Sequence, residues 1–218
     1  MQHAVSTRPM RTKREPPQVK ATNDSIVETA ERLFRQTGFQ KATVADIAHE
    51  LQMSPANVYR FFASKFKINE AVCRRLFEEI EAAVEEIAKS PGPASETLRN
   101  LVLTVSRMNA HRFTSDRKLH ELFEAAHNEN WPIVGEHFDW MDKVFGQIIG
   151  RGMAAGEFRA GDAKLASVVF RSICLKFCNP RQMAEEPEPT VDQIVDFCLA
   201  ALADKGRAGA YARKLAVA

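Results

Sequence analysis

The segment from Thr43 to Lys65, TVADIAHELQMSPANVYRFFASK, constrains the fold of this chain more than any other. Thr43 and Asp46 form a Thr-x-x-Asp start signal, in which side chains bind backbone N–H groups that the first turn of a helix leaves without partners. Ser54 suits an N-cap, and Pro55 suits the first helical position because proline has no N–H to satisfy. We therefore expect two short helices joined by a tight bend, with a third helix directly after them.

The apolar residues of this segment repeat with the period of a helix. On the first helix they are Val44, Ile47, Ala48 and Leu51, and on the second they are Val58, Phe61 and Phe62. Asn57, Tyr59 and Arg60 are then left to face outward. A helix pair of this kind can place its second helix in the DNA major groove, but an ordinary helical hairpin has the same spacing. The pattern alone leaves both interpretations open.

Charge is distributed unevenly along the chain. Residues 1–75 carry 13 Lys and Arg against 7 Asp and Glu, whereas residues 76–204 carry 13 against 21. The overall charge of +2 therefore hides a basic N-terminal part and an acidic remainder. This asymmetry favours a phosphate-bearing partner for the N-terminal part.

From about Ile26 to Ile68 the chain resembles the tetracycline-repressor (TetR) family of bacterial transcriptional regulators. The resemblance is carried by the patterns IVETAERLFRQTGFQKATVADIA and SPANVYRFFASK, above all by Tyr59, Phe62 and Ser64-Lys65. It implies a regulator, a repressor by family default, that binds a palindromic operator as a homodimer and is released by a small-molecule effector. It implies neither enzymatic activity nor a cofactor.

The resemblance also assigns roles in DNA binding. It implies that Thr43, Tyr59 and Lys65 contact phosphates. The residues implied at or near base edges are Ser54, Pro55, Ala56 and Asn57, and the outward-facing Arg60 completes the expected DNA-binding set. Two positions depart from the family pattern, because Gln52 replaces the usual bend glycine and Phe66 replaces an acidic residue. Gln52 is expected to adopt a positive φ at some energetic cost.

No segment has the pattern of a strand, so we expect an all-α fold of about nine helices: a three-helix head with a helix-turn-helix, followed by a larger ligand-binding and dimerisation body. The expected division is a disordered basic tail (1–22), a helix-turn-helix domain (23–66), a body (67–205) and a basic C-terminal tail (206–218). Expected helices include about 24–37, 65–89, 162–177 and 190–203. The N-terminal tail could follow the minor groove, or it could have no role.

The helix expected at 162–177 has apolar residues on more than one side, so it is either buried or shared with a partner chain. Together with the helix at 190–203 it could form a four-helix interface between two copies, or both could cap a monomeric core. The candidate interface residues are Leu165, Val168, Val169, Ile173, Val195, Cys198 and Leu202.

Large side chains concentrate around the helix that Pro132 is expected to open. The candidates to line a pocket for an apolar or aromatic effector are Phe113, Phe123, Trp131, His137, Trp140, Met141 and Phe145. The same side chains could instead fill the core.

His120, Glu124 and His127 are spaced at i, i+4 and i+7, so together they could reach a metal ion. That would make the chain a helical metal-binding or enzymatic protein. The apolar face defined by Leu119 and Leu122 places the three on a solvated face, which argues against it. A helical interaction protein without a ligand is a further alternative.

The four cysteines are scattered, as in a cytoplasmic protein with reduced thiols. Cys174 and Cys178 are spaced at i, i+4 and could be a redox or metal pair, or simply buried side chains. No apolar run approaches the ~18 residues of a membrane span, and no signal peptide is apparent, so we expect no membrane partner. Nucleophile, phosphate-loop and HExxH motifs are also missing, which argues against an enzyme.

Overall fold

The computed structural model describes residues 17–176 and 189–204, and within these ranges the fold is all-α, as predicted. The helices are α1 (Pro17–Thr37), α2 (Val44–Glu50), α3 (Pro55–Tyr59), α4 (Lys65–Lys89), α5 (Ala94–Ser115), α6 (Arg117–Asn128), α7 (Pro132–Ala154), α8 (Ala163–Lys176) and α10 (Val191–Leu202). Between these helices, the described residues form one isolated β-bridge, Phe158 with Ala203. No described helix is long and apolar enough to cross a membrane.

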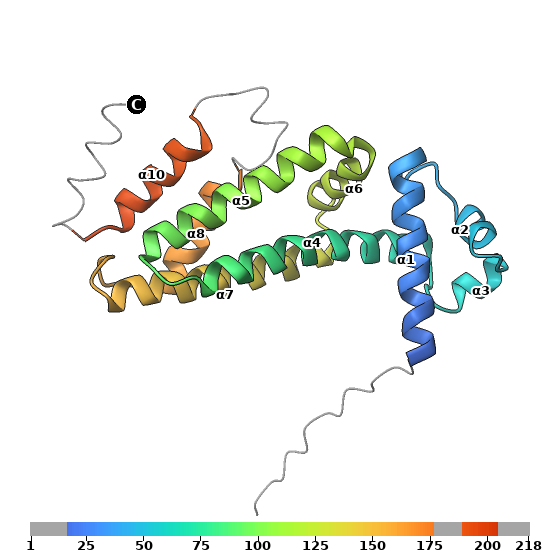
Figure 1. The fold of residues 1–218 in the computed structure, drawn as a ribbon, viewed down its shortest axis with the longest axis horizontal. Coiled ribbons are helices and arrows are strands. Elements are labelled where there is room, and N and C mark those ends of the chain that lie inside the picture. The colour runs from blue at the N-terminus through green and yellow to red at the C-terminus, as the bar shows by residue number, and fades with distance from the viewer. Residues whose placement is uncertain (1–16, 177–188, 205–218) are drawn as a thin grey trace, which may run out of the picture.

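The helices form a small head and an elongated body that share α4 (Figure 1). The head consists of α1, α2 and α3 at one end of α4, and α5 and α7 run beside α4 through the body. At 1.5 Å per residue, the 25 residues of α4 reach roughly 37 Å. The same helix therefore belongs to the cores of both parts.

Helix signals in the sequence set most of these boundaries. Ser64 begins α4 by accepting a hydrogen bond from the backbone N–H of Lys67, and α4 ends at Lys89, just before the Pro91-Gly92-Pro93 turn. The expected bounds of α4 are thus confirmed. In contrast, α1 begins at Pro17 rather than at the expected Asp24. Proline at a first helical position is consistent with this earlier start.

The head is held by a compact apolar core at the crossing of its helices. Its fully buried members include Phe34 of α1, Ile47 and Ala48 of α2, and Val58 of α3. Ala48 has no exposed surface, and its small side chain lets α2 and α3 approach each other. The position of α3 on the head is therefore fixed by packing as well as by its cap.

The start of α5 is fixed by a buried carboxylate. Glu157 accepts hydrogen bonds from the backbone N–H groups of Ala94 (2.7 Å) and Ser95 (2.9 Å), and also from the Ser95 hydroxyl. A negative charge is stabilised at a helix N-terminus, where N–H groups point outward without partners. The contact ties α5 to the segment between α7 and α8.

Polar contacts connect the head to the body. Arg35 near the end of α1 pairs with Asp116, which stands between α5 and α6. Lys118 of α6 donates to the backbone carbonyl of Gln36, and Arg75 of α4 lies 3.4 Å from the carboxylate of Glu31. A movement of the α5–α6 corner would therefore directly change its contacts with α1.

Candidate DNA-binding surface and effector sites

The predicted helix-turn-helix is present, and each predicted cap of α2 and α3 is confirmed. The Thr43 hydroxyl accepts from the backbone N–H of Asp46 at 3.1 Å, and the Asp46 carboxylate accepts from the backbone N–H of Thr43 at 2.8 Å. Ser54 accepts from the backbone N–H of Asn57 at 3.2 Å. Gln52, at the bend, has the expected positive φ, 52°.

The face of α3 that turns away from the head core carries most of the predicted DNA-binding residues. Ser54, Pro55, Ala56, Tyr59 and Arg60 are exposed, with Tyr59 at 49%, whereas Asn57 is half-buried. The helix itself is short, because it ends at Tyr59 and does not continue to residue 62. After it the chain forms tighter turns in which Phe61 and Phe62 are half-buried.

Thr43 and Lys65 are brought together by the fold although the α2–α3 pair separates them in sequence. The Lys65 ammonium group donates to the backbone carbonyl of Gln40 at 2.9 Å, just before α2. Partial burial lowers the pKa of Lys65, and the nearby charge of Asp46 opposes that shift. The beginnings of α2 and α4 therefore lie next to each other, with a lysine between them.

The predicted effector residues divide into core and pocket side chains. Met141 and Phe145 are completely buried in the body, and Phe123 and Trp131 are nearly so. His137 and Trp140 line a pocket of about 200 Å³ between α4 and α7, together with Phe77 and three glutamates. Phe113, the remaining candidate, is half-buried beside His120.

His137 is held in place from two sides. Its Nδ1 lies 2.7 Å from a carboxylate oxygen of Glu81, and its ring stacks on Phe77 with centroids 4.2 Å apart. Burial lowers the pKa of His137, whereas the Glu81 carboxylate acts in the opposite direction. The hydrogen bond to Glu81 and the ring contact with Phe77 link α7 to α4.

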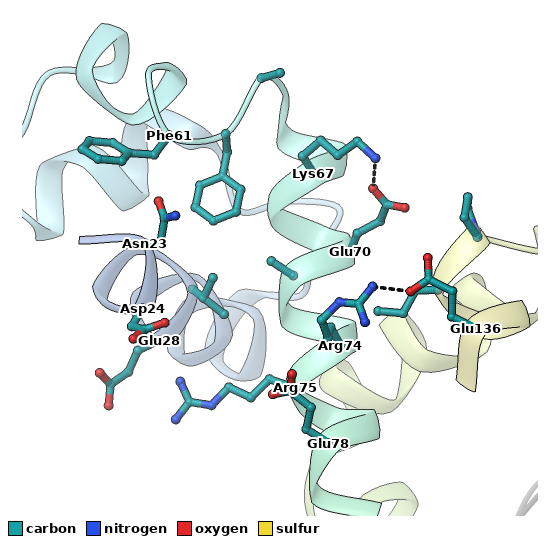
Figure 2. Close-up of a pocket in the computed structure, with 16 residues that line it drawn as sticks. Asn23, Asp24, Glu28, Phe61, Lys67, Glu70, Arg74, Arg75, Glu78 and Glu136 are labelled. Carbon is teal, nitrogen blue, oxygen red and sulfur yellow. Dashed lines mark hydrogen bonds and ion pairs between the residues drawn. The ribbon is translucent and has the colours of Figure 1, made fainter. Parts of the chain in front are cut away.

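A larger pocket, of about 840 Å³, lies at the junction of head and body, between α1, the α3–α4 loop, α4 and the start of α7. Figure 2 shows Arg74 of α4 reaching toward Glu136 of α7, and Lys67 beside Glu70. The Arg74 guanidinium lies 2.6 Å from the Glu136 carboxylate. This pocket could not be recognised in the sequence, because residues as distant as Asn23 and Glu136 form it.

The expectation that His120, Glu124 and His127 lie on a solvated face of α6 is wrong. His120 is only 3% exposed, and Glu124 and His127 are half-buried. The buried face of α6 is wider than its leucine pattern suggests, because the end of α5 packs against the edge that carries His120. In the described part of the chain, no group of three His, Cys, Asp or Glu side chains is placed to hold a metal ion.

The candidate dimer residues fall into two groups, one exposed and one buried. Leu165, Val168 and Val169 of α8 are exposed, Leu165 at 62%, and Ile173 is half-buried. Three candidates are corrected to core residues, because they pack inside the protomer: Val195, Cys198 and Leu202. Phe197 of α10 was not among the candidates. It is 60% exposed and lines an apolar pocket of about 290 Å³ together with Leu165 and Val169. In the sequence, the only indication of this exposed position was a large aromatic residue outside the apolar stripe of the helix.

Two buried cysteines that were not paired in the sequence analysis lie next to each other. Cys174 of α8 lies beside Cys198 of α10, and their hydrogen bond lowers the pKa of Cys198. Cys178 lies outside the described residues, so the i, i+4 pair stays a prediction. Burial raises the pKa of Cys73 to about 12, which keeps this thiol protonated.

Two family models match the chain. The model described as "Bacterial regulatory proteins, tetR family" matches residues 26–72, and the model described as "Tetracyclin repressor-like, C-terminal domain" matches residues 94–196. The first match ends within α4 and the second begins at the start of α5, so most of α4 lies between them. No curated protein matches the chain in sequence.

Several solved structures share this fold at low sequence identity. RolR in complex with resorcinol has a TM-score of 0.64 and 18% identity, over 91% of this chain and 94% of that one. SmeT, the repressor of the Stenotrophomonas maltophilia multidrug efflux pump SmeDEF, has a TM-score of 0.62 and 19% identity, over 86% and 93%. A putative transcriptional regulator from Saccharomonospora viridis in complex with choline has a TM-score of 0.58 and 19% identity, over 82% and 94%. At these identities the similarity establishes the fold.

Proposed function

Because the chain belongs to the TetR family of bacterial transcriptional regulators, we propose that it is a repressor that binds a palindromic operator as a homodimer and leaves it when a small molecule binds in the helical body. The single observation that carries the proposal is the capped, outward-facing α3 beside the basic beginning of α4. Such a regulator would act in the cytoplasm, and the proposal includes no enzymatic step.

In this proposal α3 enters the major groove. Ser54, Pro55, Ala56 and Asn57 at its N-terminal end lie at or near base edges, because that end of a recognition helix points into the groove. Tyr59 and Lys65 contact phosphates on the flanking backbone, as does Thr43 from the start of α2. Arg60, exposed at the other end of α3, adds a positive charge near the same backbone.

The proposed homodimer forms through α8 and α10. Two heads must lie about 34 Å apart to read successive major grooves on one side of the duplex, so the body has to fix their separation. Leu165 and Val169 of α8 and Phe197 of α10 are exposed and line one apolar pocket. Both helices lie toward the end of the body opposite the head (Figure 1). A two-fold contact of this surface with itself would bury it and hold the heads apart.

Release of DNA is proposed to occur through α4 and the contacts of α1 with the α5–α6 corner. An effector that binds one conformation of the body more tightly shifts the population toward that conformation, by no more than its differential affinity. RolR and the S. viridis regulator each have a solved complex with a small organic molecule, resorcinol and choline respectively. These examples support a small organic effector without identifying one for this chain.

Selection from a random DNA library with the full-length protein, followed by fluorescence anisotropy on the selected duplex, tests DNA binding. We expect Lys65→Ala and Tyr59→Ala to weaken binding to all sequences about equally, because phosphates carry no sequence information. Asn57→Ala should mainly relax base preference, by about 1–3 kcal/mol if its contact is bidentate. Lys89→Ala, an exposed lysine at the far end of α4, is the matched control. Unchanged affinity in Lys65→Ala and Tyr59→Ala would overturn the proposed surface.

A further inference from the structure

The corner where α5 meets α6 contains two buried polar side chains with atoms that have no hydrogen-bond partner. Arg112 and His120 are 7% and 3% exposed. The Arg112 Nη1 has no partner, although Nη2 donates to a carboxylate oxygen of Glu79 at 3.3 Å. Neither ring nitrogen of His120 is hydrogen-bonded, and the Glu124 carboxylate, 3.6 Å from Nε2, is too distant.

Buried polar atoms of this kind are uncommon, because a donor removed from water without a new partner costs free energy. Here three such atoms, one of Arg112 and two of His120, belong to neighbouring residues at one corner of the body. Both side chains lie against the ring of Phe123, which places them close to each other. Buried donors gathered at one place in this way can bind a ligand that carries hydrogen-bond acceptors.

The side chains that pack against Arg112 and His120 at this corner are aromatic. The Arg112 guanidinium lies over the ring of Phe123 at 5.5 Å, and the Phe113 ring meets His120 edge-on at 5.2 Å. Phe123 also lies roughly parallel to the His120 ring at 6.3 Å. Flat aromatic surfaces beside a guanidinium favour a flat ring with an anionic substituent.

The chemistry of the two side chains identifies the substituent. A guanidinium presents a planar fork of N–H donors that matches both oxygens of a carboxylate. Burial lowers the pKa of His120, so at neutral pH the imidazole is uncharged and offers one N–H donor and one acceptor. One guanidinium and one imidazole N–H can together satisfy a single carboxylate.

We propose that the effector is an aromatic carboxylate, and that Arg112 and His120 hold its carboxylate group at the α5–α6 corner. This inference rests on the proposed function as a ligand-responsive regulator. The carboxylate of the ligand takes the place of Glu79 on the guanidinium. Glu79 is half exposed, so after displacement its charge is solvated rather than left buried.

The location of Arg112 connects such a site to the head. Glu79 belongs to α4, so its displacement removes an ion pair between α4 and α5. Arg112 also lies one helical turn before Asp116, which pairs with Arg35 of α1. Occupation of the corner therefore alters contacts to both elements that carry the head, and this gives the ligand a route to lower DNA affinity.

The test is titration calorimetry of the full-length protein with benzoate and 1-naphthoate, with benzamide as the neutral counterpart of benzoate. We expect saturable binding of at least one carboxylate and weaker binding of benzamide. Arg112→Met should reduce carboxylate affinity by roughly tenfold to a hundredfold, the loss of a charged hydrogen bond. Arg107→Met, an exposed arginine on the same helix, should leave it unchanged. Glu79→Gln should tighten binding, because it removes the competing carboxylate.

Thermal unfolding separates a ligand site from a structural one. Arg112→Met and His120→Phe should unfold at or above the wild-type midpoint, because each variant removes buried polar atoms that have no partner, and the half-exposed Glu79 is solvated once its pair with Arg112 is lost. The proposal is overturned if neither carboxylate binds the wild type, if Arg112→Met binds as well as Arg107→Met, or if both buried-site variants unfold well below the wild type or fail to fold. DNA binding is measured on the same samples, so its retention without carboxylate binding rejects this inference alone.

Discussion

At the scale of single residues, the head depends on a few side chains that bind backbone N–H groups. Thr43, Ser54 and Ser64 each begin a helix in this way, and all three hydrogen bonds occur within the segment that the resemblance identified. A cap of this kind contributes about 1 kcal/mol, which is a large share of the stability of a short helix. The orientation of α3 is therefore set by individual side chains that can be identified in the sequence.

The capping box predicts a specific pH dependence. Hydrogen bonds donated by the hydroxyl and the backbone N–H of Thr43 lower the pKa of Asp46 below its ordinary 3.8. The unfolded chain then binds a proton more readily than the folded one, so the stabilisation is complete above about pH 4 and is lost as pH falls through the folded-state pKa. Asp46→Asn should show a shallower loss of stability below pH 4 in urea unfolding. Parallel pH profiles for the two proteins would contradict this.

His120 shows where residue-level prediction failed. On a helical wheel it stands next to the stripe formed by Leu119 and Leu122, and a residue at that edge can face solvent or a neighbouring helix. The choice depends on where α5 lies, and the side chains that cover His120 come from there and from α6 itself. Periodicity identifies a buried face but does not determine its width.

At the scale of helices, the close approach of α7 to the start of α5 depends on a glycine. A Cβ atom added to Gly152 would lie 2.3 Å from the ring of Phe158 and 2.9 Å from the Cβ of Ala94. The same turn of α7 contains Gly150, where an added Cβ would meet only the Cβ of Ala163, at 3.9 Å. We therefore expect opposite effects on stability when each of these two glycines is replaced by alanine.

Gly152→Ala should lower the free energy of unfolding by about 1–3 kcal/mol, because the ring of Phe158 has to move out of a packed core. Gly150→Ala should leave it unchanged or raise it by up to about 1 kcal/mol, because alanine favours the helix and the contact is an ordinary one. Chemical unfolding of both variants measures the difference. Equal free energies of unfolding for the two variants would show that α7 packs less closely against the start of α5 than these distances indicate.

Helix boundaries were predictable where a cap or a proline marks them. Ser64 and Pro91 bracket α4, and Pro132 opens α7, all as expected. The junction pocket was not predictable, because Asn23 and Glu136 meet only after α1 and α7 pack on α4. The assignment of Val195 to an interface failed for a related reason, since an apolar stripe does not say whether its own protomer or another chain covers it.

At the scale of the whole molecule, the exposed apolar surface of α8 and α10 makes a prediction about assembly. Phe197→Glu should convert a dimer to a monomer, because it places a charge in the centre of the proposed contact without disturbing the protomer core. Analytical ultracentrifugation measures the mass, and Ala110→Glu, an exposed position on α5, serves as the control. A wild-type protein that is already monomeric, or a Phe197→Glu dimer, would place the interface elsewhere.

The proposal that the head binds DNA phosphates is tested most directly by the salt dependence of binding to the selected duplex. If Lys65 and Arg60 of each head neutralise phosphates, a dimer displaces about four counterions, and affinity should fall about a hundredfold between 50 and 200 mM salt. Full-length protein and fluorescence anisotropy suffice for the measurement. Binding that changes less than twofold over this range, or no binding at the lower salt concentration, would contradict the account.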